Sequence, residues 1–480
     1  MRIDYIYRKI NFIVLAVMCI VAMGCKKFIE VPPPIDSLPT GPAFSSDTRA
    51  ASTVRALYGQ MSGTTGFFTT TLAFSGGVQL AMNVSSDELV PSDVTNEFYL
   101  HQITPTNGSN DSNIWAALYN IIYGANAVIE NVPQSPGVSE AGKKQFVAEA
   151  KFIRAANYFY LVNLYGGVPL ITSTDYRVNS VLPRNSADEV YTLILSDLEY
   201  SVANLGPAYI GTSTSVPLPQ RLRANKYAAA ALLARVYLYR KNYAKAEEMA
   251  TLVIEGAGKT MYDFEPDLSR TFLTSSKEVI LQIQQPGTNL YTYDAYNQIP
   301  SSSTAIPAYQ LSDALTQAFE AGDQRKVNWT ATTLNGGKTY YYPFKYKIKS
   351  GTGTVRTESM VFLRLSEVYL VRAEARVQQN KLTLAIDDID AVRRRSILPS
   401  SFNSTNPAAG KGELIDLVLH ERFVELFAEV GHRWMDLIRT GKADEVLKNS
   451  QNWRPEAKLF PIPKGDVDKN PAIKQNPGYN

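Results

Sequence analysis

Residues 225–246 of the chain read NKYAAAALLARVYLYRKNYAKA. Alanine and leucine dominate from Asn225 to Tyr239, and both residues favour an α-helix. Lys241-Asn242 interrupts this run and indicates a tight turn, after which Tyr243 to Glu255 predicts a second helix. The stretch therefore predicts two helices that pack antiparallel across a short turn.

The same helix pair is predicted again 139 residues further along the chain. Arg364 to Gln379 and Lys381 to Arg395 form this second pair. Alanines where two helices cross, and a bulky residue at the start of the second helix, are typical of tetratricopeptide-like units. The positions that correspond at this constant offset are Ala234 and Ala373, Tyr243 and Leu382, and Ala246 and Ala385.

Two further helix pairs are predicted on either side of these. Apolar residues recur with helical spacing from Trp115 to Ile129, and again from Ser139 to Leu164 before Gly166-Gly167. The fourth pair runs from Glu413 to about Thr440, with a break at Gly431. Because long insertions separate the pairs, the sequence predicts one mainly α domain and not a regular solenoid.

The insertions contain short strands. Val279 to Gln284 is apolar and predicts one strand, and Trp329 to Leu334 and Lys338 to Tyr342 flank Asn335-Gly336 as in a β-hairpin. From Trp453 onward the chain is too rich in proline for a helix, and we expect this tail to wrap over the body of the domain.

The composition excludes several classes of protein. The chain has 480 residues, is 45% hydrophobic and 19% charged, and carries a net charge of +3, which is typical of a globular protein and unusual for one that binds nucleic acid. Only 3 His and 2 Cys make a zinc site or a Cys/His catalytic pair unexpected. We find no G-x-S-x-G, H-E-x-x-H or phosphate-binding loop, and we expect no metal or cofactor.

The N-terminus has the pattern of a targeting segment. Arg2, Arg8 and Lys9 precede an apolar run from Phe12 to Met23, which is too short to span a membrane and fits a secretory signal peptide over residues 1–24. Cys25 then follows small residues, as in the lipobox of a bacterial lipoprotein, and residues 25–44 predict a lipidated cysteine and an extended, proline-rich stalk. The alternative is an ordinary signal peptide with an incidental cysteine.

Tyrosine is concentrated in one insertion. Between Pro286 and Tyr346 there are 8 Tyr in 61 residues, about twice the average of 28 in 480. Sugars bind proteins by stacking on aromatic rings and by hydrogen bonds from their hydroxyls, so these rings predict a glycan site; the alternative is ordinary loop packing. The aromatic candidates are Tyr291, Tyr293, Tyr296 and Trp329, and the polar candidates are Asn289, Asp294 and Asn297.

Six segments, taken in order, resemble the SusD/RagB family of outer-membrane nutrient-binding lipoproteins. They cover nearly the whole chain: WAALYNIIYGAN (115–126), AEAKFIRAANYFYLVNLYGGVPL (148–170), AAAALLARVYLYR (228–240), LRLSEVYLVRAEA (363–375), ERFVELFAEVGHRWMDLIRTGK (421–442) and FPIPKGDVDKNPAIKQNPGY (460–479). The resemblance implies a SusD-like α/α superhelix of tetratricopeptide-like helix pairs with long loop and short-strand insertions.

The resemblance also implies a domain organisation and further site residues. A single domain would span residues 45–480, with helix pairs over about 105–255 and 361–442, ligand-face insertions over about 60–104 and 256–360, and the wrapping tail over 453–480. The loop after Ser86-Asp87-Glu88 would face the ligand through Asn96, Phe98 and Tyr99.

The function that the resemblance implies is non-catalytic nutrient uptake. The protein would be lipid-anchored in the outer membrane, facing the cell exterior, and would deliver captured glycans to a SusC-like TonB-dependent transporter. Three alternatives stay open: a peptide-binding uptake protein of the RagB type, a lipid-anchored glycoside hydrolase, and an interaction scaffold that binds a partner peptide in its helical grooves. A hydrolase would need two carboxylates across a cleft, and no local motif marks such a pair.

Overall fold

The repeated helix pair of the sequence is present twice in the computed structural model, which describes residues 43–65, 70–211 and 220–479. Helices α9 (Lys226–Tyr239) and α10 (Tyr243–Thr251) form the first pair, and α15 (Leu365–Gln378) and α16 (Leu382–Ser396) form the second. The connecting turns use equivalent residues, because Lys241 (φ 57°) and Asn380 (φ 59°) both adopt the left-handed conformation. The prediction of a structural repeat at this offset is therefore confirmed.

Small residues let the paired helices approach closely. Ala234, Ala246, Ala373 and Ala385 are all fully buried. Around Ala373 and Ala385, helices α15 and α16 share a core with α17 (Lys411–Leu426) through residues that include Val377, Ile389, Leu414 and Val418. Burial of this apolar surface is the main force that holds the units together.

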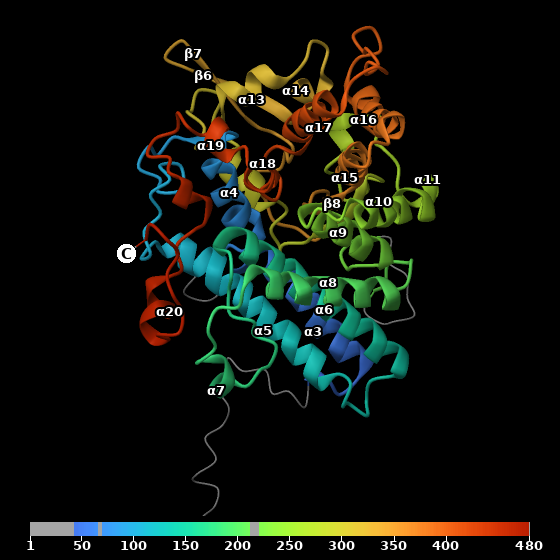
Figure 1. Cartoon of the computed structure of the whole chain (residues 1–480), viewed down its shortest axis with the longest axis vertical. Helices are drawn as coiled ribbons and strands as arrows, with labels where there is room; N and C mark the ends of the chain where they lie inside the picture. Colours follow the sequence, from blue (N-terminus) through green and yellow to red (C-terminus); the bar gives the residue numbers. More distant parts are fainter. Residues whose placement is uncertain (1–42, 66–69, 212–219, 480) are drawn as a thin grey trace, which may run out of the picture. The chain divides into compact units, whose positions relative to one another are not determined.

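The N-terminal half of the scaffold has four long helices. The predicted pair is α5 (Ala116–Asn131) and α6 (Glu140–Tyr165), with Ser139 as the N-cap of α6 and Gly166 (φ 71°) at its end. Helices α3 (Asp47–Ser62) and α8 (Ala187–Asn204) were not predicted and pack against them (Figure 1). A capping box between Ser186 and Glu189 starts α8.

The fourth unit breaks at Gly431, as predicted, but its first helix ends before that residue. Helix α17 ends at Leu426, and α18 (His432–Thr440) starts after Gly431. Gly431 has φ 74°, and a Cβ there would lie 2.4 Å from Sδ of Met82. Only glycine therefore fits where this turn meets helix α4 (Gln79–Ser85).

The insertions form four two-stranded antiparallel sheets among the described residues. The predicted hairpin is β6 (Thr330–Asn335) and β7 (Lys338–Pro343), and the predicted strand β4 (Val279–Ile283) pairs with β8 (Met360–Arg364). Strand β3 (Leu89–Pro91) pairs with β5 (Tyr309–Leu311) and so joins the two insertions, while β1 (Thr64–Thr65) pairs with β2 (Thr70–Thr71).

Short helices complete the described fold. The α-helical ones are α7 (Tyr176–Asn179), α11 (Gly258–Met261), α12 (Tyr293–Gln298), α13 (Asp313–Ala318), α14 (Gln324–Trp329), α19 (Ala443–Val446) and α20 (Lys464–Lys469). Helical turns of other types cover Phe74–Val78, Ser109–Trp115, Leu252–Gly256, Leu268–Arg270 and Pro455–Lys458.

Buried ion pairs connect the helices of different units. Glu367 of α15 accepts two hydrogen bonds from Arg235 of α9, at 2.5 and 2.6 Å, and both side chains are almost fully buried. Glu374 pairs in the same way with Arg439 of α18. These acidic residues therefore serve the scaffold, through arginines that lie on other helices.

The proline-rich tail lies against the C-terminal end of α6. The backbone N–H of Phe460 donates to the carbonyl of Leu164 at 2.7 Å, and the Asn476 amide donates to the carbonyl of Tyr165 at 3.0 Å. Within the described residues, no helix combines the length and the apolar character that crossing a bilayer would require.

Candidate functional site

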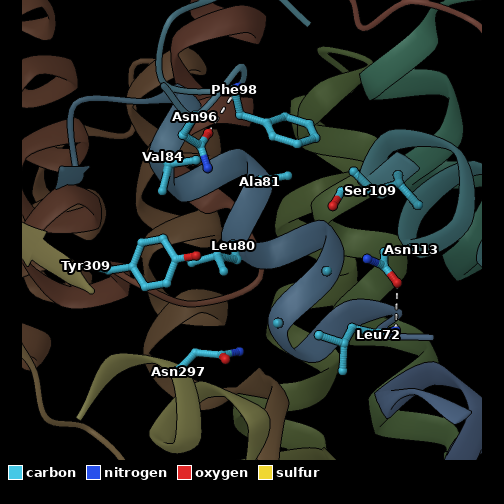
Figure 2. A pocket seen from close by; sticks show the side chains of 13 residues that line it. Leu72, Leu80, Ala81, Val84, Asn96, Phe98, Ser109, Asn113, Asn297 and Tyr309 are labelled. Atoms are coloured by element: carbon cyan, nitrogen blue, oxygen red, sulfur yellow. Dashed lines mark hydrogen bonds between the residues drawn. The ribbon is translucent and has the colours of Figure 1, made fainter. Parts of the chain in front are cut away.

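A cavity of about 200 Å³ lies where the two insertions meet, beside helix α4 (Figure 2). Its walls come from four parts of the chain: α4 with the segment that leads into it, the loop after β3, the helical turn Ser109–Trp115 before α5, and the segment from α12 to β5. The lining residues are Leu72, Gly76, Gly77, Leu80, Ala81, Val84, Asn96, Phe98, Ser109, Asn113, Ile114, Asn297 and Tyr309.

Two glycines allow the segment before α4 to form one wall of the cavity. A Cβ at Gly77 would lie 2.0 Å from the carbonyl oxygen of Leu72, and Gly76 has φ 80°. A Cβ at Gly76 would also lie 2.9 Å from Nδ2 of Asn297. The close approach of α12 to this segment therefore depends on the missing side chain.

Several polar groups in the cavity have hydrogen-bonding capacity left. Figure 2 shows the Tyr309 hydroxyl and the Asn297 amide directed inward from the same side. Neither group makes a hydrogen bond to another described residue. Asn113 and Asn96 accept backbone N–H groups with their Oδ1 atoms, from Leu72 at 3.0 Å and from Phe98 at 3.1 Å, which leaves their amide N–H groups available.

The remaining walls are apolar. Phe98 packs against Phe460, with 5.5 Å between the ring centroids, and is only 6% exposed. Leu80, Ala81 and Ile114 add aliphatic surface. The described residues that line the cavity include no charged side chain, so the cavity combines apolar surface with neutral hydrogen-bonding groups.

A buried carboxyl group on α12 binds the segment that forms one wall of the cavity. Asp294 accepts hydrogen bonds from Oγ of Ser75 at 2.7 Å and from Nε2 of Gln79 at 2.8 Å. Burial raises the pKa of Asp294 to about 6, although the hydrogen bond from Ser75 acts in the opposite direction. Its contacts tie α12 to the segment around α4, so Asp294 positions the cavity walls and does not face a ligand.

The structure brings some of the sequence-predicted site residues together. Asn96, Phe98 and Asn297 line the cavity. Tyr291 and Tyr296 do not line the cavity but stack on each other, with ring centroids 5.3 Å apart, and Tyr296 is 52% exposed. These five residues therefore remain candidates for contact with a ligand.

Other predicted residues lie elsewhere. Trp329 is 1% exposed, its indole N–H donates to the carbonyl of Leu268 at 2.9 Å, and its ring packs on Phe272. The prediction that Trp329 offers a ring face to a ligand is wrong, because the ring is enclosed in the core. Tyr293 is also buried.

Two candidates stay at the periphery. Tyr99 is half-buried and does not line the cavity, and Asn289 lies on the loop after β4, where its carbonyl accepts a hydrogen bond from Arg356 at 2.6 Å. Cys25, the predicted lipidation site, lies outside the described residues. The sequence reasoning missed Tyr309 and Asn113, although Tyr309 belongs to the tyrosine-rich segment that it singled out.

One group of side chains has the spacing of metal ligands, but arginine side chains already balance the charges of its carboxylates. Donor atoms of Glu320, His420 and Glu421 lie within 4.8 Å of one another. Arg393 donates to both oxygens of Glu320 at 2.7 and 3.0 Å, and Arg325 donates to Glu421 at 2.9 Å. These carboxylates therefore belong to the ion-pair network of the scaffold.

The described residues thus form a helix-pair scaffold whose insertions enclose a small cavity lined by uncharged side chains. Two family models match the chain: one described as "SusD family", over residues 287–479, and one described as "Starch-binding associating with outer membrane", over residues 27–238. The chain belongs to the SusD/RagB family, whose members include starch- and glycan-binding proteins associated with the outer membrane.

Individual relatives agree with this assignment. The SusD-like protein P38 of Formosa agariphila is 27% identical over 444 residues, which cover 81% of this chain and 84% of that protein. The starch-binding protein SusD of Bacteroides thetaiotaomicron is 25% identical, with 72% of this chain and 75% of that protein covered. A solved laminarin-binding SusD-like protein shares the fold, with a TM-score of 0.70 and 24% identity over 90% of this chain and 100% of its own.

Proposed function

We propose that this protein captures neutral glycans at the α4 cavity and delivers them to a SusC-like TonB-dependent transporter in the outer membrane, without cleaving them. The observation that carries the proposal is the lining of the cavity. It offers apolar surface to the C–H face of a sugar ring, and hydroxyl and amide groups to its rim.

The size of the cavity indicates how a glycan would bind. At about 200 Å³ it is smaller than the roughly 300–1,000 Å³ of most small-molecule sites, so it takes one end of a longer ligand. Tyr296, whose ring stacks on that of Tyr291, directly precedes the lining residue Asn297 on α12, and we propose that its exposed ring contacts the next sugar unit. We therefore propose an oligosaccharide with one ring enclosed and the remainder on the exposed surface.

The charges near the cavity favour binding over hydrolysis. A glycosidase requires two carboxyl groups about 5–9.5 Å apart on either side of the bond that it cleaves. The described residues that line the cavity supply none, and the carboxyl of Asp294 beneath it is occupied by Ser75 and Gln79. The absence of a carboxylate pair from this lining supports a non-catalytic role.

The anchor and the transporter partner are the parts of the proposal that rest on the sequence and the family. The apolar run before Cys25 fits a lipoprotein signal, and the description of the matching family model includes association with the outer membrane. If the proposal holds, purification of the lipidated chain from its native membrane will co-purify a large barrel protein. Recovery of the chain alone would contradict the transporter partnership.

Binding at the cavity is tested with a panel of neutral oligosaccharides and the variant Tyr309→Phe, which removes one hydroxyl group and keeps the ring. We expect the affinity for the best ligand to fall roughly two- to tenfold, the value of one hydrogen bond. Tyr176→Phe is the matched control, because Tyr176 is 76% exposed and lies far along the chain on α7. Equal affinities for the wild type and Tyr309→Phe would contradict the site.

A further inference from the structure

A second hollow, larger than the α4 cavity, lies between helix α3, the loop after β4 and the segment that leads into α9. Its volume is about 770 Å³. We call it the arginine hollow and define it by the residues that line it: Ser52, Arg55, Ala56, Tyr58, Gly59, Gln60, Gln220, Leu222, Arg223, Gln284, Gln285, Pro286, Gly287, Thr288, Gly353, Thr354 and Arg356.

One face of α3 forms the floor of the hollow. Ser52, Arg55, Ala56, Gly59 and Gln60 follow the spacing that places residues on one side of a helix. Ala56 and Gly59 have the smallest side chains among them and leave room for the hollow. A Cβ at Gly59 would lie in ordinary contact with Cγ of Pro286, at 3.6 Å, so a side chain longer than alanine at this position would take up part of the hollow.

The charge of the hollow is positive. Its described lining contains three arginines and no carboxylate. Arg223 is neutralised by Glu149, with N–O distances of 2.5 and 2.9 Å, but Arg55 is exposed and makes no hydrogen bond or ion pair to a described residue. Arg356 donates to the carbonyls of Asn289 and Gly287, which hold the guanidinium in place and leave its charge unbalanced.

A buried amide in the wall lacks partners. Gln285 is 6% exposed, and neither its Oε1 nor its Nε2 atom has a hydrogen-bond partner among the residues that the structure describes. Leaving such a group unpaired in the interior is unfavourable, and a ligand that reaches it recovers that free energy. This unpaired amide is an observation independent of the arginines, and it also indicates that a polar group binds here.

We propose that the arginine hollow is a second binding site, which takes an oligosaccharide carrying a carboxylate or sulfate group. Arg55 and Arg356 would contact the anionic group, and the amides of Gln60, Gln220 and Gln284 would contact ring hydroxyls. The one aromatic ring in the lining, Tyr58, is 3% exposed, so binding here depends on charge and hydrogen bonds and not on ring stacking.

An acidic peptide fits the hollow less well than an acidic sugar. Peptides bound in extended form need apolar pockets for alternate side chains or a free strand edge. Among the lining residues, those with amide, hydroxyl and guanidinium side chains outnumber the aliphatic ones, which are Ala56, Leu222 and Pro286. The hollow also differs from the α4 cavity, whose described lining is uncharged, so the two sites select glycans of different charge.

The test is calorimetric titration of the full chain in detergent with four probes. They are tetragalacturonate, its carboxyl-reduced neutral form, a sulfated galactan tetrasaccharide and tetraglutamate. We expect the galacturonate or the sulfated sugar to bind at least tenfold more tightly than the neutral form, and binding to weaken as salt is added. No binding of either acidic sugar, an Arg55→Gln effect on the neutral form as large as on the acidic sugars, or equal binding of tetraglutamate would overturn the proposal.

Variants locate the binding. Arg55→Gln should lower the affinity for the acidic sugar roughly tenfold, because a charge-assisted hydrogen bond is lost at a partly exposed site. Arg55→Lys should restore part of it, and Ala56→Phe should block the hollow. Arg49→Gln, on the same helix outside the lining, is the control and should have no effect. Unchanged affinity in Arg55→Gln and Ala56→Phe would contradict this location.

One further variant distinguishes binding at the arginine hollow from binding at the α4 cavity. Tyr309→Phe changes the α4 cavity only and should leave binding of the acidic sugar unchanged. Failure of the neutral glycan to bind at the α4 cavity would therefore leave the arginine hollow standing, and the reverse also holds. Loss of acidic-sugar binding in Tyr309→Phe would show that one site binds both ligands and would overturn the second site.

Discussion

Replacing Asp294 by asparagine tests whether this residue supports the cavity as a buried, ionisable group. The pKa of Asp294 in the folded chain is about 6, against an ordinary value of 3.8. Between these two values the folded chain holds the proton and the unfolded chain releases it. Below about pH 4 the carboxyl is protonated in both states and does not lower the stability of the fold. As the pH rises from about 4 to about 6, ionisation favours the unfolded chain, so the free energy of unfolding falls.

The size of the effect follows from the same difference. One pKa unit corresponds to about 1.4 kcal/mol, so the ionised carboxylate destabilises the fold by about 3 kcal/mol at pH 7. Asparagine cannot ionise, yet it can accept from Gln79 through Oδ1 and donate to the hydroxyl of Ser75. We therefore expect Asp294→Asn to be more stable than the wild type by about 3 kcal/mol at pH 7 and by less than about 1 kcal/mol at pH 4.

The assay is urea unfolding, followed by tryptophan fluorescence, at several pH values from about 4 to 7.5. The difference in unfolding free energy between variant and wild type should grow with pH over this range. Asp387→Asn is the control for the substitution itself, because Asp387 is exposed on α16. A pH-independent difference for Asp294→Asn, or a variant less stable than the wild type at pH 7, would show that burial does not raise the pKa of Asp294.

Three other substitutions have expected outcomes. Trp329→Ala should lower the unfolding free energy by about 3–5 kcal/mol, since the ring is enclosed in the core, and should not weaken neutral-glycan binding at low temperature. Weaker binding with normal stability would contradict the place of Trp329 in the core. Glu367→Ala should destabilise the fold by about 3–5 kcal/mol, because it leaves Arg235 buried without a counter-charge. The double variant Arg235→Met/Glu367→Leu should recover part of this loss, measured by thermal or urea unfolding. Equal losses in the single and double variants would argue against a stabilising ion pair. Cys25→Ala should release the protein from the outer-membrane fraction, and its retention there would exclude a lipid anchor.

The helix pairs could be predicted because their signals are local. Helical spacing, Ser139 as an N-cap and Gly166 as a terminator all act within a few residues of the helix that they define. Helix α8 carries an equally local signal in the capping box of Ser186 and Glu189, although it was not among the predicted helices. The hairpin around Gly336 was likewise indicated by its own turn residues.

The cavity could not be predicted because distant segments form it. Pairing of β3 with β5 brings residues near 90 next to residues near 310, and no short-range pattern encodes that contact. The same limit explains Trp329, whose burial depends on Phe272 and on the loop at Leu268. Residue type therefore indicated the chemistry of the site, and only the tertiary contacts show which side chains face it.

Capture of neutral glycans at the α4 cavity is best tested by a crystal structure with the tightest-binding neutral oligosaccharide. We expect an intact ligand with one ring between Phe98, Asn297 and Tyr309, and with the rest of the oligosaccharide toward Tyr296. A ligand bound away from the α4 cavity, or one shortened by hydrolysis, would contradict it.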